Sequence, residues 1–264
     1  VVNQYTFVEN GNNRRPDIIL FINGMPLVLM ELKSPSKDEV GVENAYKQIR
    51  NYIKDIPSLF YYNAICVISD LSSNKAGTIT SGLDRFMDWK CKDGSKEESG
   101  FAEFETFYEG MFQKKRLLDI LKNFILFSGT GTGRFKVLAG YHQYFAVRKA
   151  IERAKIATRT DGKGGVFWHT QGSGKSYSMV FLSQKIRRKF AGSPTIVILT
   201  DRDELNTQIS DTFENCGLLG KTKAAKYIAT SGDDLITKLQ GNPSFIFTLI
   251  QKFNKKDVQP IIPD

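Results

Sequence analysis

The sequence predicts an α/β protein of two domains, and three observations support this fold class. The first half contains strand-like apolar runs and one amphipathic helix in the order β-β-β-α-β. The second half alternates helices with strands, which is typical of a parallel sheet with crossover helices. Between the halves, the glycine-rich stretch SGTGTGRFKVLAG marks a boundary. We therefore expect domains at 1–128 and 141–264, joined by a linker at 129–140.

The first domain is predicted to begin with strands and tight turns. Three strands rich in Val, Ile, Leu and Phe, separated by the turn-forming residues GNN and NG, cover residues 4–10, 15–24 and 26–34. Residues 37–56 repeat apolar side chains every three to four positions, which predicts an amphipathic helix, and the apolar run 63–70 predicts a buried strand. Residues 90–100 are polar and predict a surface loop, whereas 103–127 predict one or two helices.

The second domain is predicted from the alternation of its elements. Helices are expected at 141–155, 175–190 and 202–213, and strands at 164–170, 195–200 and 244–250. Trp168 lies inside the first of these strands and is expected in the core. His169 follows it and is expected to have a structural role at the end of the strand.

Composition and charge narrow the classes of function. No apolar run in the sequence reaches the length needed to cross a bilayer. The net charge of +9 suits nucleic acid as a partner. Three widely spaced cysteines and two histidines offer no zinc spacing and suit a reducing, cytoplasmic compartment. Any metal ion should therefore be bound by carboxylates, as Mg²⁺ is. The chain begins with Val rather than Met, so we expect residues to precede it.

A phosphate-binding loop is predicted at residues 169–176, HTQGSGKS, between a strand and a helix. Gly172 and Gly174 allow backbone N–H groups to turn toward phosphate oxygens, Lys175 can reach the β- and γ-phosphates, and the Ser176 hydroxyl can ligate Mg²⁺. The candidate nucleotide-binding residues of the loop are Thr170, Gly172, Ser173, Gly174, Lys175 and Ser176. The alternative is a glycine-rich turn that contains Lys-Ser by chance.

A second candidate site lies on the hairpin formed by residues 14–35. Asp17 lies six residues before Asn23 and Glu31 lies seven residues after Gly24, so the near-equal arms should bring the two carboxylates together. Lys33 points to the same face as Glu31, because side chains alternate along a strand. Two acids and an amine could hold Mg²⁺, orient water and stabilise a phosphate under attack. The alternative is a charged sheet edge with surface salt bridges.

These residues resemble a known nuclease motif. Pro16-Asp17 followed by Glu31-Leu32-Lys33 resembles the PD-(D/E)xK superfamily, and Gln48 with Tyr52 in QIRNY resembles the QxxxY element of its RecB-like branch. Together with AGYHQYFAV, FWHTQGSGKS, VILTDRDELNTQI and TLIQKF in this order, they make nearly the whole chain similar to the restriction (R, HsdR) subunit of type I restriction-modification enzymes.

The resemblance implies a fold and a function. The fold is a PD-(D/E)xK (RecB-like) nuclease domain followed by a partial RecA-like lobe of a superfamily 2 helicase, with a parallel sheet. The function is ATP-dependent translocation on double-stranded DNA and Mg²⁺-dependent cleavage of unmodified DNA away from a recognition site. The implied cofactors are ATP and Mg²⁺. The implied partners are double-stranded DNA and the modification (HsdM) and specificity (HsdS) subunits, with no membrane.

The resemblance also implies residue roles. Asp17, Glu31 and the carbonyl of Leu32 would bind the metal ion, Lys33 would act at the scissile phosphate, and Gln48 and Tyr52 would support the site. In the motor lobe, the residue expected to contact adenine is Gln143. Without the resemblance, Gln143 would be interpreted as an exposed helix glutamine. The residues expected along the DNA path are Thr200, Asp201, Arg202, Gln251 and Lys252.

The sequence departs from the family pattern in two places. His169 replaces the glycine that opens the general phosphate-loop motif. No DEAx box follows TLIQKF before Asp264, and no second motor lobe is present. We therefore expect an N-terminal fragment that by itself binds nucleotide weakly and does not translocate.

Two other functions remain open from the sequence. The first is a different nuclease–helicase fusion in DNA repair or phage defence, which neighbouring methyltransferase and specificity genes would argue against. The second is a non-catalytic DNA-binding scaffold, which metal-dependent nicking of plasmid DNA would exclude.

Overall fold

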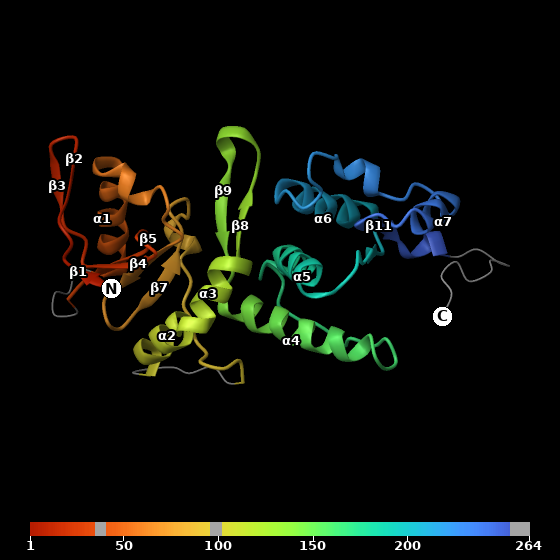
Figure 1. Ribbon diagram of the computed structural model, residues 1–264, viewed down its shortest axis with the longest axis horizontal. Coiled ribbons are helices and arrows are strands. Elements are labelled where there is room, and N and C mark those ends of the chain that lie inside the picture. Colours follow the sequence, from red (N-terminus) through yellow and green to blue (C-terminus); the bar gives the residue numbers. More distant parts are fainter. Residues whose placement is uncertain (35–40, 96–101, 254–264) are drawn as a thin grey trace. The chain divides into compact units, whose positions relative to one another are not determined.

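The computed structural model describes residues 1–34, 41–95 and 102–253, and their contacts divide the chain into two units (Figure 1). The first unit comprises Val1–Leu126 and Phe135–Arg148, and the second comprises Phe127–Arg134 and Lys149–Asp264. The domain boundaries predicted from the sequence remain a prediction. The expected linker at 129–140 is nevertheless not irregular throughout. It contains strand β9 (Phe135–Leu138), which pairs with β8 (Ile125–Ser128).

A five-stranded mixed sheet forms the centre of the first unit, in the order β1-β4-β5-β6-β7. Its strands are β1 (Val2–Asn3), β4 (Ile18–Ile22), β5 (Met25–Leu32), β6 (Ile65–Ser69) and β7 (Asn74–Gly77). Strands β5 and β6 are parallel, whereas the other neighbours are antiparallel. Parallel strands need a crossover connection, and the chain between β5 and β6 contains helix α1 (Val42–Asp55).

Helix α1 covers one face of this sheet, as its apolar periodicity predicts (Figure 1). Ala45, Ile49 and Tyr52 pack in one cluster with Ile19 of β4 and Leu29 of β5. Ile49 is 1% exposed, so its burial contributes about 1.5–3 kcal/mol. The helix begins at Val42, and the predicted start at 37–40 lies outside the described residues.

The prediction of a strand at 4–10 is wrong in its extent. Instead of one strand at 4–10 there is a separate hairpin, in which β2 (Phe7–Glu9) pairs with β3 (Asn12–Arg14). The turn residues Asn10 (φ 51°) and Gly11 (φ 76°) adopt the positive φ values that a two-residue hairpin turn requires, so the strands pair locally. Strands β1 and β7 join the five-stranded sheet and were not predicted.

The helical region after this sheet consists of two helices, α2 (Ala102–Phe112) and α3 (Lys114–Asn123). They separate at Gln113, whose side chain accepts a hydrogen bond from the Arg116 N–H and so caps α3. The prediction of a surface loop is wrong at Cys91, which is 3% exposed. Residues 96–100 of that predicted loop lie outside the described residues.

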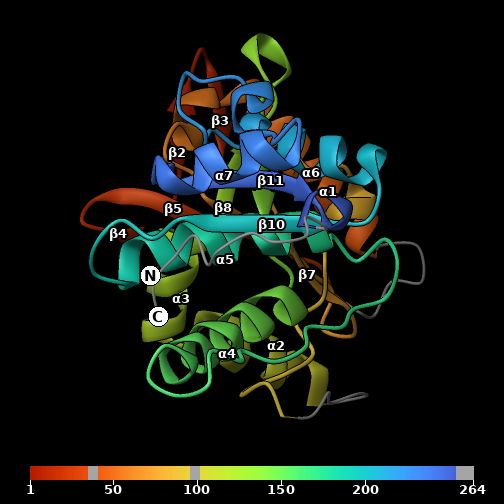
Figure 2. The same cartoon turned by 90° about the vertical axis from the view of Figure 1, so that its right-hand side faces the viewer.

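The second unit contains a two-stranded parallel sheet flanked by helices. Helix α4 (Tyr141–Ala157) enters this unit at Lys149. It is followed by α5 (Lys175–Lys189), β10 (Ile196–Thr200), α6 (Asp203–Asn215), α7 (Gly232–Gln240) and β11 (Phe245–Leu249). Figure 2 shows β10 and β11 side by side, with α5 below β10 and α7 above β11. The predicted parallel pairing is confirmed for these strands. None of the helices in the described part of the chain has the length and hydrophobicity needed to cross a bilayer.

The predicted strand at 164–170 does not form in the described structure. Val166 is 97% exposed and Trp168 is 78% exposed, so Trp168 is not a core residue. A strand needs a neighbour for its backbone hydrogen bonds, and among the described residues the only strand paired with β10 is β11. Gly165 also has φ +116°, which interrupts the extended backbone at the start of the segment.

Candidate functional site

The hairpin of β4 and β5 brings two carboxylates together at its open end. Asp17 immediately precedes β4, whose first residue, Ile18, pairs with Met30. The antiparallel register therefore places Asp17 opposite Glu31, and directly opposed side chains lie on the same face. Asp17 Oδ2 accepts a hydrogen bond of 2.8 Å from the Leu32 N–H, which holds its side chain against the end of β5.

A β-bulge makes this alignment possible. The pairing of Leu20 with Val28 is followed by that of Phe21 with Pro26, so Leu27 is the extra residue in β5. This single residue accounts for the unequal arms of the hairpin. Without it, Asp17 would lie opposite Met30, and a shift of one residue moves side chains to the other face of the sheet.

Glu31 is buried and its charge is only partly compensated. It is 3% exposed, and its Oε1 lies 2.5 Å from Lys33 Nζ. Burial raises the pKa of Glu31, the hydrogen bond from Lys33 acts in the opposite direction, and the nearby Asp17 raises it further. Oε2 is also buried, and it has no hydrogen-bond partner of ordinary geometry among the described residues. A buried, unpaired carboxylate oxygen is costly, so this atom is suited to bind a cation.

Helix α1 contributes Gln48 and Tyr52 to the same cluster. They are one helical turn apart, and Tyr52 is 4% exposed. Burial raises the pKa of Tyr52 to about 12; a hydrogen bond with Gln48 acts against this rise, whereas the charges of Glu31 and Asp17 add to it. The phenol therefore stays protonated and can donate a hydrogen bond to the Glu31 carboxyl, which in turn lowers the pKa of that carboxyl.

The side chains at this site provide only part of the ligands that a hard divalent cation needs. The described residues contain no group of three or more His, Cys, Asp or Glu side chains arranged as metal ligands. Asp17 and Glu31 provide two carboxylates, and a backbone carbonyl and water are ordinary further ligands for Mg²⁺. The unpartnered Oε2 of Glu31 is the observation in favour of this fit.

The loop before α5 has the backbone expected of an anion-binding turn. Gly172 (φ +81°) and Gly174 (φ +77°) adopt the left-handed conformation that favours glycine. No side chain caps α5 at Gly174, so the N–H groups of its first turn are available to an anion. Lys175 Nζ donates hydrogen bonds of 3.0 Å to the carbonyls of His169 and Thr170, which folds the lysine back over the loop.

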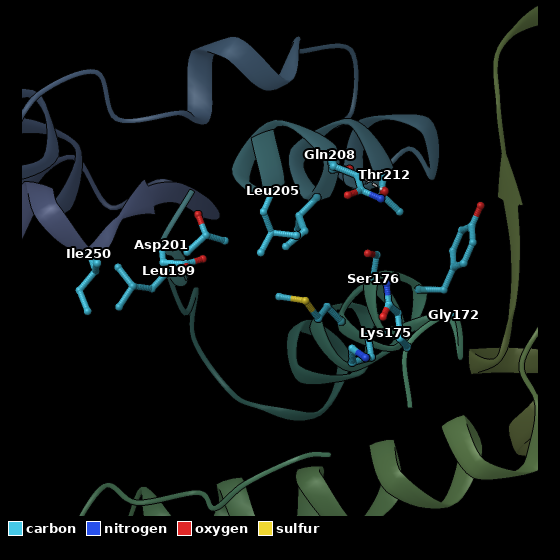
Figure 3. A pocket seen from close by; sticks show the side chains of 15 residues that line it. Gly172, Lys175, Ser176, Leu199, Asp201, Leu205, Gln208, Thr212 and Ile250 are labelled. Carbon is cyan, nitrogen blue, oxygen red and sulfur yellow. Dashed lines mark hydrogen bonds between the residues drawn. The ribbon is translucent and has the colours of Figure 1, made fainter. Parts of the chain in front are cut away.

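A cavity of about 930 Å³ opens beside this loop, a size in the range of small-molecule sites. Figure 3 shows Lys175 and Ser176 on α5 at one side, Gln208 and Thr212 on α6 at the other, and Asp201 at the end of β10. The sequence interpretation missed the contribution of α6. The sequence could have indicated this contribution, because residues at helical spacing just after β10 share one face of the helix. They are Leu205, Gln208, Ile209 and Thr212.

The predicted DNA-path residues lie at the ends of the two parallel strands. Thr200 is 8% exposed, and its hydroxyl lies 3.5 Å from the Thr248 carbonyl. Gln251 donates a hydrogen bond of 3.0 Å to the Asp201 carbonyl, which links the segments after β10 and β11. Arg202 is exposed and pairs with Asp201 over 3.5 Å. The ammonium group of Lys252 donates to the Ala229 carbonyl.

Gln143 belongs to the first unit, whereas the loop at 169–176 belongs to the second. Gln143 is 5% exposed, and its Oε1 accepts a hydrogen bond of 3.0 Å from the Gly140 N–H at the start of α4. It is therefore not an exposed helix residue, and its predicted contact with adenine remains a prediction.

Comparisons with known proteins give two family matches and several similar sequences. Residues 1–85 match the family described as type I restriction enzyme R protein N terminus, and residues 142–263 match SWI2/SNF2 ATPase. The HindI endonuclease subunit of a type I restriction enzyme from Haemophilus influenzae is 36% identical over 97% of this chain and 25% of its own length. A putative endonuclease subunit, MjaIXP, from Methanocaldococcus jannaschii is 32% identical over 97% of this chain and 26% of its own length. The chain thus spans about a quarter of the length of these curated relatives.

Proposed function

The chain belongs to the family of R proteins, the endonuclease subunits of type I restriction enzymes, and on this premise we propose that its first unit is a PD-(D/E)xK nuclease centre that cleaves DNA. The observation that carries the proposal is the convergence of Asp17, Glu31 and Lys33 at one end of the hairpin, where Glu31 Oε2 is buried without a hydrogen-bond partner among the residues that the structure describes. Separate surface salt bridges would not need a buried carboxylate.

Each side chain has a distinct task in this proposal. Asp17, Glu31 and the Leu32 carbonyl hold a divalent cation, which when bound supplies Lewis-acid polarisation of the phosphate and lowers the pKa of water. The Lys33 ammonium lies beside Glu31 and can neutralise charge that develops on the phosphate oxygens. Tyr52 and Gln48 hold the Glu31 carboxyl in place from α1.

We further propose that the second unit binds ATP at the loop 169–176. The α5 N-terminus and the two left-handed glycines receive the phosphates, Lys175 moves from its two carbonyl partners to the terminal phosphates, and Ser176 ligates Mg²⁺. In the complete protein, ATP hydrolysis at this loop would drive translocation on double-stranded DNA. The partners of the complete protein would be the modification (HsdM) and specificity (HsdS) subunits.

The function is tested by removing each cofactor from the assembled enzyme. With Mg²⁺ and ATP, unmodified plasmid that carries the recognition sequence should be cut. Omission of ATP, or addition of EDTA in excess over Mg²⁺, should abolish cutting, because the motor needs nucleotide and the nuclease needs the cation. Agarose gel electrophoresis measures the loss of supercoiled plasmid. Cutting that persists in EDTA would contradict the metal-dependent centre, and methylated plasmid provides the uncut control.

Cation binding at Glu31 should depend on pH in a direction set by its raised pKa. The cation binds the ionised carboxylate, so its affinity should fall as pH falls through the raised pKa, by up to about tenfold per pH unit below it. Isothermal titration with Mn²⁺ in two buffers of different ionisation enthalpy should detect up to about one proton released per ion bound.

The control for this titration is Glu43→Gln, which removes an exposed carboxylate at the start of α1 and should leave Mn²⁺ binding unchanged. The same pKa shift affects stability without the cation. The folded state binds the proton of Glu31 more tightly than the unfolded chain, so stability should fall as pH rises from 4.5 through the raised pKa. Mn²⁺ affinity that is flat across this range would exclude Glu31 as a ligand.

A further inference from the structure

The first fifteen residues have an unusual composition for the edge of a sheet. They contain four Asn, one Gln and two Arg, with Glu9 as their one acidic residue. Amide and guanidinium side chains are the groups that contact the phosphates, sugars and base edges of DNA. Whether they can do so depends on which of them face solvent.

One face of the β2–β3 hairpin is fixed to the end of α1. Arg14 pairs with Asp55 at 2.7 Å, and Asn12 Nδ2 donates to the Asp55 carbonyl. Glu9 Oε2 accepts hydrogen bonds from the N–H and the hydroxyl of Ser58, at 3.0 and 2.8 Å. The single acid of the segment is therefore used on this inner face, and the hairpin is held at three points.

The opposite face of the hairpin is exposed and carries no acid. Asn13 pairs with Val8 across the hairpin, Asn10 lies in the turn, and the exposed Arg15 follows the end of β3. The side chains of Asn10, Asn13 and Arg15 make no hydrogen bond or ion pair with any described residue. We call these three residues, with the exposed Asn3 and Gln4, the amide-rich face.

The amide-rich face leads directly to the carboxylate pair. Only Pro16 separates Arg15 from Asp17 in the chain. The backbone N–H of Gln4 donates a hydrogen bond of 2.8 Å to the Asp17 carbonyl, and Asn3 pairs with Ile18 of β4. A group bound on this face is thus held by the same strands that position Asp17.

We propose that the amide-rich face binds double-stranded DNA and places its backbone over Asp17 and Glu31. Arg15 contacts a phosphate, and the amides of Asn10 and Asn13 contact phosphate, sugar or groove edges, as in other β-ribbons that bind DNA. Because the hairpin is already fixed to α1, little ordering is required on binding. This inference rests on the nuclease function proposed for the same unit, and it adds the surface that receives the substrate.

The test compares Arg15→Ala with Arg15→Lys and Arg85→Ala in the complete R protein. Arg85 is an exposed arginine in the same unit, next to β7 at the other edge of the sheet, and is the matched control. Affinity for a duplex without a recognition sequence is measured by fluorescence anisotropy against KCl concentration, with Ca²⁺ in place of Mg²⁺ to prevent cleavage. Melting temperatures should be equal, because these side chains are exposed.

Loss of one phosphate contact should weaken binding about five- to tenfold near 0.1 M salt and reduce the salt slope by about one. Arg15→Lys should retain the slope, because lysine keeps the positive charge that faces the phosphate. An affinity and slope equal to those of Arg85→Ala would overturn the proposal. Absence of metal-dependent cleavage by the wild type would instead contradict the nuclease assignment, and the anisotropy comparison would still decide the DNA surface.

Discussion

Replacing Glu31 with Gln should lower the rate of DNA cleavage by roughly 10³-fold or more, while ATP hydrolysis stays within about twofold of wild type. The amide has nearly the same shape as the carboxylate and can still accept a hydrogen bond from Lys33, but it carries no charge to bind the cation. Because Glu31 lies in the first unit and the loop 169–176 in the second, the substitution should leave the motor intact. Plasmid cleavage and phosphate release, measured on the same preparation, check both expectations.

The matched control for this substitution is again Glu43→Gln, which makes the same chemical change at an exposed position of α1 and should cleave normally. Lys33→Ala should also abolish cleavage, because the ammonium group next to Glu31 would be lost. If Glu31→Gln removed ATP hydrolysis as well as cleavage, Glu31 would have a structural role. If neither activity changed, the nuclease centre would lie elsewhere in the protein.

Replacing Lys175 with Ala should reduce ATP hydrolysis by about 10²- to 10³-fold and abolish cleavage away from the recognition site. Among the described residues that line the cavity beside α5, the lysine is the one positive side chain. Its loss removes charge stabilisation from the transferred phosphate, and without hydrolysis the enzyme cannot pull DNA toward the nuclease. Phosphate release and a triplex-displacement assay of translocation check the two effects.

The control for the loop is Lys189→Ala, which removes an exposed lysine in the last turn of the same helix. It should leave both activities unchanged. Lys175→Ala also removes two hydrogen bonds to loop carbonyls, so a melting curve is needed to show that the second unit remains folded. ATP-driven translocation that persists in a folded Lys175→Ala protein would disprove the phosphate-loop assignment.

The helices and strands predicted best are those that a short stretch of sequence specifies by its own apolar pattern. The amphipathic period of α1, the apolar runs of β4 to β6, and the parallel pair β10 and β11 agree with the structure within a few residues. The strand at 164–170 was predicted from the same kind of apolar pattern and is absent from the described structure. An apolar run specifies a strand only where a neighbour supplies hydrogen bonds, and periodicity does not report the neighbour.

The candidate site, too, was predictable in its residue types but not in its exact alignment. The residue types and spacing of Asp17, Glu31 and Lys33 were readable from the chain, as were Gln48 and Tyr52 one turn apart. Counting the arms of the hairpin left their alignment uncertain by one residue. The bulge at Leu27 removes that uncertainty, because it places Asp17 opposite Glu31.

The sequence alone therefore determined which side chains are available for chemistry: two acids and a lysine around a turn, a glycine loop before a helix, and amides with arginines ahead of Asp17. Only the tertiary structure decided how they are used. It buried Glu31 with one oxygen that has no partner in the described part of the chain, engaged Glu9 with Ser58, and left Arg15 exposed. The physical reason is that burial, register and desolvation depend on contacts between segments far apart in the chain, and no local pattern encodes these contacts.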